Sequence, residues 1–220
     1  FDITERRLHQ INLQYLNTHD QLTGLFNRRH FLQIMNERIQ SHNIDSEKFA
    51  LLFLDVDQFK VINDTCGHSA GDIFIKELSH ELFDVINETN PFSRLSADQF
   101  ALLVNYKNSN ELRKLASDIL TKVRAFQFKW DRHVFTQSMS IGIAPFDQHI
   151  PSGEELLSYA DTACLIAKEG GRDQIHIYSA EIGMHSSYKR ELYWVNEVNN
   201  ALKDEDEECT FLYRKLYKGT

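Results

Sequence analysis

The stretch Leu51-Leu-Phe-Leu-Asp-Val-Asp57 decides the expected fold, because its apolar residues predict a buried strand that ends in two carboxylates. A second acidic stretch, Arg94-Leu-Ser-Ala-Asp-Gln-Phe100, is a turn of small residues between two apolar runs and predicts a hairpin. A strand ending in Asp beside a hairpin tip carrying Asp is suited to present oxygen ligands to a divalent ion on a nucleotide. The two stretches therefore predict carboxylates gathered at one end of a sheet.

Hydrophobic periodicity on either side of these stretches predicts alternating helices and strands. Helices are expected over 28–40, 112–123 and 154–168, with another from about 73 to 86 after a polar loop at 63–71. Strands are expected over 49–55, 92–95, 100–106, 133–143 and 174–178. Helices that cross over a mainly antiparallel sheet give an α+β fold of the cyclase or ferredoxin-like palm type, with a central sheet flanked by helices.

The composition restricts the class of protein. A net charge of -8 argues against a general nucleic-acid binder, so no nucleic-acid partner is expected. No apolar run approaches the ~20 residues that span a bilayer, and no signal peptide opens the chain. The three cysteines are scattered, as in reduced thiols, and the ten histidines form no zinc motif. These features favour a cytoplasmic location, with membrane attachment left open for a longer protein.

Several motifs in a fixed order resemble the GGDEF family, the bacterial diguanylate cyclases. They are Asp20-x-Leu-Thr-Gly-Leu-x-Asn-Arg-Arg29, Asp55-Val-Asp-x-Phe-Lys-x-Ile-Asn-Asp64, Gly67-His-x-x-Gly-Asp72 and Ala160-Asp-x-Ala-Cys-x-x-Ala-Lys-x-Gly-Gly-Arg172. In this context Ser96-Ala97-Asp98-Gln99-Phe100 resembles the Gly-Gly-Asp-Glu-Phe motif that names the family. The resemblance covers about residues 20–178.

The resemblance implies a reaction and a role for each matching residue. In the family, two GTP molecules are joined when each 3′-hydroxyl attacks the other's α-phosphate, which needs cations and carboxylates. The implied magnesium ligands are Asp55, the backbone carbonyl of Val56, and Asp98, which would also act near the attacking hydroxyl. The implied nucleotide contacts are Asn63 and Asp72 for guanine, Ser96 and Ala97 at the tip, and Lys60, Lys168 and Arg172 for the phosphates.

Structural roles remain open for the same residues. Asp55 also suits a strand-end cap or a surface salt bridge, and Asn63 suits a turn. Asp72 suits a helix N-terminus, while Lys168 and Arg172 suit a helix C-terminus, because the helix dipole favours those charges.

The chain departs from the family at the tip. Gln99 replaces a metal-binding Glu and removes a charge that a hard cation favours. Ser96 and Ala97 replace two glycines, and each adds a Cβ that costs about 1 kcal/mol if the backbone has positive φ. Asp173 stands where the family usually has Asn, and the feedback motif Arg-x-x-Asp is replaced at 87–90 by Asn-Glu-Thr-Asn.

Four segments are expected along the chain. Residues 1–19 resemble a signalling helix after a truncated PAS-like domain, and residues 20–180 form the GGDEF domain. Residues 181–208 predict a linker helix and an acidic segment, and residues 209–220 resemble the truncated start of an EAL domain. The expected partners are thus an upstream sensor domain, a downstream EAL domain, GTP with Mg²⁺, and a second copy in a homodimer.

The expected function is that of a degenerate, regulatory GGDEF domain in cyclic-di-GMP signalling, with GTP as a candidate ligand. Two alternatives stay open. One is a residually active diguanylate cyclase, and the other is a purely structural dimerisation module. The enzyme is disfavoured by Ser96, Ala97 and Gln99, whereas the intact base and phosphate positions argue against a purely structural role.

Overall fold

A computed structural model describes residues 7, 15–42, 47–86 and 89–179 of the chain. The chain divides into two units, Phe1–Tyr178 and Ser179–Thr220. The predicted linker helix, acidic segment and start of an EAL domain lie outside the described residues. Residues 1–6 and 8–14 of the segment predicted to be a signalling helix also lie outside the described residues, whereas residues 15–18 are helical.

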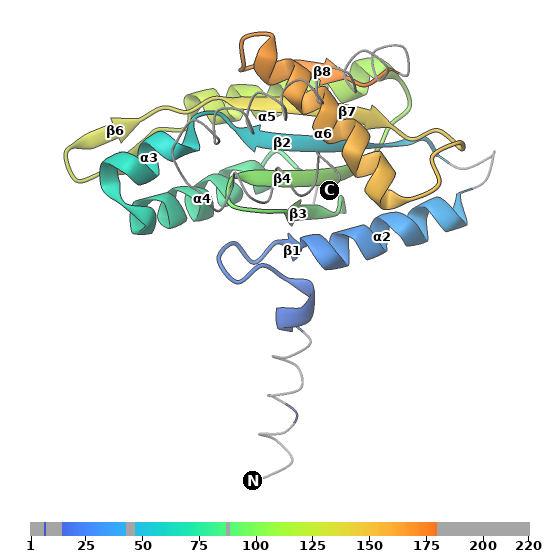
Figure 1. The fold of residues 1–220 in the computed structure, drawn as a ribbon, viewed down its shortest axis with the longest axis horizontal. Coiled ribbons are helices and arrows are strands. Elements are labelled where there is room, and N and C mark those ends of the chain that lie inside the picture. The colour runs from blue at the N-terminus through green and yellow to red at the C-terminus, as the bar shows by residue number, and fades with distance from the viewer. Residues whose placement is uncertain (1–6, 8–14, 43–46, 87–88, 180–220) are drawn as a thin grey trace, which may run out of the picture. The chain divides into compact units, whose positions relative to one another are not determined.

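A six-stranded sheet forms the centre of the first unit, in the order β1-β3-β4-β2-β7-β8 (Figure 1). Its strands are β1 (Phe26–Asn27), β2 (Phe49–Val56), β3 (Phe92–Arg94), β4 (Gln99–Asn105), β7 (Met139–Pro145) and β8 (Ile175–Ile177). The pairs β3–β4, β4–β2 and β2–β7 are antiparallel, while β1–β3 and β7–β8 are parallel. The predicted mainly antiparallel sheet of an α+β palm fold is therefore confirmed.

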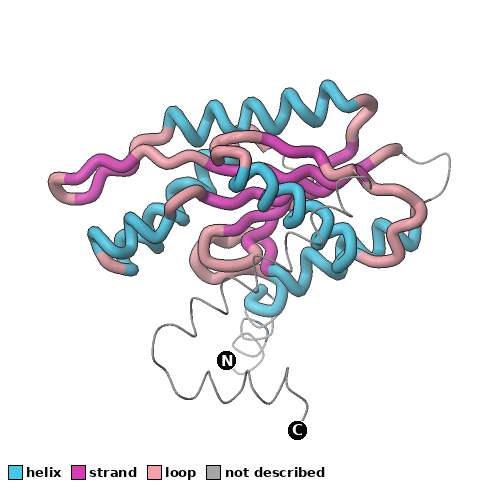
Figure 2. Tube along the Cα trace, turned by 45° about the horizontal axis from the view of Figure 1, so that its top comes forward, coloured by secondary structure: helices cyan, strands magenta, loops and turns pink. Residues whose placement is uncertain are grey.

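Helices cover both faces of this sheet (Figure 2). They are α2 (Arg28–Ser41), α3 (Phe59–Cys66), α4 (His68–Phe83), α5 (Ser109–Ala125) and α6 (Gly153–Glu169). Strand β2 is buried along its whole length, and its residues alternate between two hydrophobic cores. Leu52 and Leu54 pack with apolar residues of α4 and α5, whereas Leu51 and Phe53 pack with those of α2 and α6.

The packing of β7 against α6 depends on one glycine. A Cβ atom added to Gly142 would lie 2.0 Å from the backbone oxygen of Ala160. This close approach brings the helix directly onto the sheet.

Two sequence-based predictions about secondary structure were wrong. The expected loop at 63–71 is instead the end of α3 and the start of α4, separated by Gly67. The polar residues there form the exposed side of these helices, and Gly67, with a φ of 84°, makes the sharp change of direction.

The expected strand at 133–143 is two strands. Its first part, β6 (His133–Phe135), pairs with β5 (Phe128–Trp130) in a separate hairpin, and its second part is β7. Asp131, with a φ of 50°, lies in the turn that reverses the chain between β5 and β6. Alternation along the sequence does not reveal such a change of partner, because both strands have the same period.

Candidate functional site

The site lies where the carboxyl end of β2 meets the hairpin tip between β3 and β4. The antiparallel register of β2 with β4 places Asp55 opposite Gln99. The backbone N–H of Val56 donates to the carbonyl oxygen of Asp98 across 3.1 Å, which ties the tip to the strand end. The last turn of α6 brings Lys168 to the same point. The predicted meeting of the two acidic stretches is confirmed.

Asp55 is a buried carboxylate, 3% exposed, with both of its oxygens engaged. Its Oδ1 lies 2.5 Å from Nζ of Lys168 and has no hydrogen-bond donor besides that ammonium. Its Oδ2 accepts a hydrogen bond of 3.0 Å from Nε2 of Gln99. Of the roles left open for Asp55, the one seen here is an ion pair, in which the carboxylate is buried and the lysine side chain is 30% exposed.

Gln99 connects Asp55 to the hairpin tip. Its Oε1 accepts a hydrogen bond of 2.7 Å from Oγ of Ser96, while its Nε2 donates to Asp55. A carboxylate only accepts hydrogen bonds, so the amide must turn its nitrogen toward Asp55 and its oxygen toward the hydroxyl. Gln99 therefore offers a donor at the position where the family's Glu offers a negatively charged oxygen.

Asp98 and Lys168 have opposite charges but their pKa values shift in the same direction. Burial and the charge of Asp55 raise the pKa of the Asp98 carboxyl above its ordinary value. Burial alone would lower the pKa of Lys168, but the hydrogen bond and the charge of Asp55 outweigh it and raise that pKa. The raised pKa values favour protonation of both groups and reflect their closeness to the carboxylate of Asp55.

The hairpin tip is supported by Arg94. Its guanidinium donates hydrogen bonds to the carbonyl oxygens of Ser96 and Ala97, and the bond to Ala97 is 2.9 Å long. The same guanidinium forms an ion pair with Asp20 at 3.2 Å. Neither Ser96 nor Ala97 has positive φ, so the backbone strain expected from replacing the two glycines is absent. The tip has become an ordinary turn that L-residues adopt without strain.

Asp57, which directly follows β2, has different hydrogen-bond partners from Asp55. It is buried and accepts hydrogen bonds from the hydroxyls of Ser138 and Ser140 and from the backbone N–H of Asp173. This carboxylate joins β2 to β7 and to the turn after α6, and it has a structural role.

The turn after α6 contains a contact that the sequence did not predict. Asp173 has a φ of 51° and receives two hydrogen bonds of 2.9 Å from Nε of Arg124 on α5. Asp tolerates the left-handed region better than most residues, which explains why it is accepted where the family usually has Asn. The signal in the sequence was the change of residue at 173, but its partner lies 49 positions away.

The expected base and phosphate contacts lie at the same end of the sheet. Asn63 is half-buried on α3, and Gly71 of α4 is packed so closely that an added Cβ would lie 2.0 Å from the Asn63 amide oxygen. Asp72 follows Gly71 and is exposed. Lys60 and Arg172 are also exposed, and neither forms an ion pair with any described residue. Their proposed roles in nucleotide binding stay predictions.

The residues around Asp55 do not fit a divalent cation as they are arranged here. Lys168 and Gln99 occupy both oxygens of the principal carboxylate, and Gln99 presents N–H to it rather than oxygen. Among the residues with described positions, no three His, Cys, Asp or Glu side chains come together as a metal-binding group. The Mg²⁺ expected from the resemblance would therefore have to compete with the ammonium of Lys168 and the N–H of Gln99 for the oxygens of Asp55.

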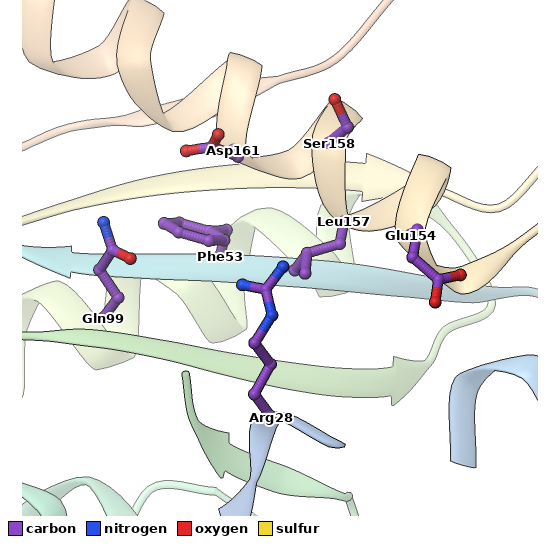
Figure 3. Close-up of a pocket in the computed structure, with 7 residues that line it drawn as sticks. All are labelled: Arg28, Phe53, Gln99, Glu154, Leu157, Ser158 and Asp161. Carbon is purple, nitrogen blue, oxygen red and sulfur yellow. The ribbon is translucent and has the colours of Figure 1, made fainter. Parts of the chain in front are cut away.

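Gln99 also lines a shallow hollow of about 250 Å³. Figure 3 shows Arg28 extending from the start of α2 across the sheet toward α6. The residues that line the hollow are Arg28, Phe53, Gln99, Glu154, Leu157, Ser158 and Asp161. It contains charges of both signs and shares only Gln99 with the carboxylate site.

Comparison with known proteins agrees with the fold and the motifs. Residues 17–174 match the family described as diguanylate cyclase, GGDEF domain. This match covers more than half of the 220 residues, and the chain belongs to the GGDEF family. It is thus a domain of cyclic-di-GMP signalling. Within the described residues there is no helix whose length and apolarity would suffice to cross a membrane.

The relatives include a probable diguanylate cyclase and a cyclic di-GMP phosphodiesterase. The chain is 34% identical over 180 residues to the probable diguanylate cyclase DgcE of Escherichia coli, covering 82% of this chain and 16% of DgcE. It is 29% identical over 219 residues to the cyclic di-GMP phosphodiesterase PdeB of Shewanella oneidensis, covering 99% of this chain and 25% of PdeB. The chain thus spans a quarter or less of these relatives.

A solved structure supports the fold. The coiled coil and GGDEF domain of DgcB from Caulobacter crescentus, crystallised with c-di-GMP, superimposes with a TM-score of 0.73 at 24% identity. The match covers 80% of this chain and 93% of DgcB as crystallised.

Proposed function

We propose that this domain is a degenerate, regulatory member of the GGDEF family that binds GTP and makes no cyclic-di-GMP. One observation carries the proposal, which is the division of the site into two parts. Asp55, Gln99 and Lys168 satisfy one another, whereas four other expected contacts, Asn63 and Asp72 for the base and Lys60 and Arg172 for the phosphates, have no side-chain hydrogen bond or ion pair among the described residues. The residues expected to bind metal contact one another, whereas the residues expected to bind the base and phosphates are free to contact a nucleotide.

The available part suits guanine. An amide and a carboxylate, Asn63 and Asp72, together offer the acceptor and donor atoms that match the edge of this base. Their helices α3 and α4 pack closely at Gly71, so the two side chains are carried on a rigid pair of helices. Lys60 and Arg172 supply positive charge for phosphates without an internal ion pair to break.

The proposal is tested by calorimetric titration of the chain with GTP, combined with a product assay. We expect saturable binding of GTP and no cyclic-di-GMP above background after incubation with Mg²⁺. A turnover near the ~1 per second that is common among enzymes would contradict the proposed silence. If millimolar GTP gives no heat, no change in melting temperature and no change in the NMR spectrum, the purely structural alternative holds instead.

Residual diguanylate cyclase activity is the second candidate, and Asp98 is the observation that favours it. This carboxylate has a raised pKa and lies beside Asp55, which are properties of a general base. The same product assay on Asp98→Asn identifies any such activity, because a rate that survives the substitution comes from elsewhere.

The proposed role in the longer protein is to pass a signal from a PAS-type sensor to an EAL domain. Its support is the alignment with the phosphodiesterase PdeB, which continues through the tail to 99% of the chain. A phosphodiesterase assay of the full-length protein with and without GTP tests it. A rate that is independent of GTP would contradict a nucleotide-dependent relay.

A further inference from the structure

We propose that the ammonium of Lys168 takes the place of the divalent cation, so that this site recognises nucleotide phosphates without a metal. The choice of ligand rests on the proposed function. The replacement of the cation concerns only Asp55, Gln99 and Lys168, and it can be tested without any nucleotide.

The first argument is the position of the ammonium. Nζ of Lys168 lies 2.5 Å from Oδ1 of Asp55, a carboxylate that is 3% exposed. Removing one partner of a buried ion pair leaves an uncompensated charge and strongly destabilises the fold. Lys168 supplies this partner from within the chain, at the oxygen that a metal ion would otherwise share.

The second argument is the polarity of Gln99. Its Nε2 donates to Oδ2 of Asp55, and its Oε1 is held by the hydroxyl of Ser96. A cation that approaches Asp55 would meet an N–H group with a partial positive charge. To become a ligand, Gln99 would have to turn over and break both hydrogen bonds.

The third argument is the local charge. Asp55, Asp98 and Lys168 together carry a single negative charge when all are ionised. With Glu at position 99 the same group would carry two, which is the charge that a divalent cation balances. Since Mg²⁺ affinity depends strongly on the number of charged oxygen ligands, the substitution at 99 removes the demand for a metal.

This arrangement makes the binding of nucleotide independent of a divalent cation. Lys60 and Arg172 are the remaining cations for phosphate, and their contacts are charge-assisted hydrogen bonds that need no metal bridge. We therefore expect GTP to bind as well in EDTA as in Mg²⁺, within about twofold in affinity.

The decisive experiment removes the internal cation and offers an external one. Lys168→Met should lower the melting temperature by about 6–20 °C, because Asp55 loses its partner. Saturating Mn²⁺ should then raise that temperature by about 3–6 °C, and it should leave the unsubstituted chain unchanged. The matched control is Lys114→Met, an exposed lysine on α5, which should show neither effect.

A second variant keeps the test decisive if Lys168→Met does not fold. Gln99→Glu restores the family's charge and should bind Mn²⁺ at least about tenfold more tightly than the unsubstituted chain, measured by electron paramagnetic resonance of free Mn²⁺. The control, Gln148→Glu, adds the same charge beyond the far end of β7 and should not. Tight Mn²⁺ binding by the unsubstituted chain, or failure of Mn²⁺ to act on either site variant, overturns the proposal.

The nucleotide experiment separates this proposal from the proposed function. If GTP binds only in the presence of Mg²⁺, the function stands and the metal-free site is wrong. If GTP does not bind under any condition while Mn²⁺ still rescues Lys168→Met, the function is wrong and the role of Lys168 stands.

Discussion

Single substitutions at the hairpin tip change the chemistry of the site without disturbing its backbone. Ser96 and Ala97 lie outside the positive-φ region, and Ser96 gains a hydrogen bond to Gln99. Gln99 carries no charge, but its amide donates a hydrogen bond to the carboxylate of Asp55. The three replacements fit one another, which is the consistency expected of a tip that has settled into a new arrangement.

Asp72 is expected to contribute directly to guanine recognition. Asp72→Ala leaves donors of the base unpaired, which costs about 1–3 kcal/mol and weakens GTP roughly tenfold to a hundredfold in calorimetry. The control is Glu77→Ala, another exposed carboxylate on α4, which should leave the affinity within about twofold. Equal effects of both substitutions would mean that only the overall charge matters.

Asp98 is expected to reduce the stability of the fold at neutral pH. Its pKa is raised in the folded state by burial and by Asp55, so its ionisation is less favourable there than in the unfolded chain. Asp98→Asn should therefore increase the free energy of unfolding at pH 7. The gain should disappear as the pH falls below the ordinary value of 3.8, where Asp98 is protonated in both states.

Urea denaturation of both proteins across pH 3–7 measures this difference. Asp118→Asn, at an exposed position on α5, is the control and should change little at any pH. A gain that grows as the pH falls would show that the sign is wrong.

At the scale of elements, the site depends on contacts that join segments far apart in the sequence. Arg94 links the hairpin tip to Asp20, which precedes β1 by several residues. Asp57 and Arg124 both hold the turn after α6, which carries Arg172. The orientation of this turn is thus set by β2 and α5 rather than by α6 alone.

The contact between Asp20 and Arg94 should make part of the stability depend on pH. Burial acts to raise the pKa of Asp20, but hydrogen bonds from Thr23 and the charge of Arg94 outweigh it, so that the pKa is lowered. A lowered pKa contributes stability that is complete above the unfolded value, 3.8, and is lost as the pH falls through the folded one.

Asp20→Asn should therefore destabilise the chain at pH 6 and lose this effect in strongly acidic solution, as measured by urea denaturation. Arg94→Lys keeps the charge but removes the paired donors that hold Ser96 and Ala97, so it should reproduce part of the loss at pH 6. A constant difference between Asp20→Asn and the unsubstituted chain at all pH values would contradict the ion pair.

At the scale of the whole molecule, the chain divides after Tyr178. Among the described residues, the buried side chains of both hydrophobic cores come before that residue. We expect a chain that ends at Ser179 to fold cooperatively, with a melting temperature within about 4 °C of the full chain, a shift equivalent to roughly 1–2 kcal/mol. Circular dichroism during heating measures it. Loss of the cooperative transition on truncation would mean that the tail belongs to the folded core.

The sequence by itself determined the family, the order of most helices and strands, and the meeting of Asp55 with the tip that carries Asp98 and Gln99. It could do so because hydrophobic periodicity and motif order are local properties. It did not reveal α3, the hairpin of β5 and β6, or the absence of strain at Ser96 and Ala97.

Only the tertiary structure decided which partner each charged group takes. Lys168 lies 113 positions from Asp55 in the chain and is paired with it in the fold, a contact that the sequence did not predict. Asp55 and Asp57 are two residues apart and look equivalent in the sequence, yet one faces an ammonium and the other faces two hydroxyls. Such pairings are set by strand register and helix packing, which bring distant residues within hydrogen-bond distance and which no local pattern encodes.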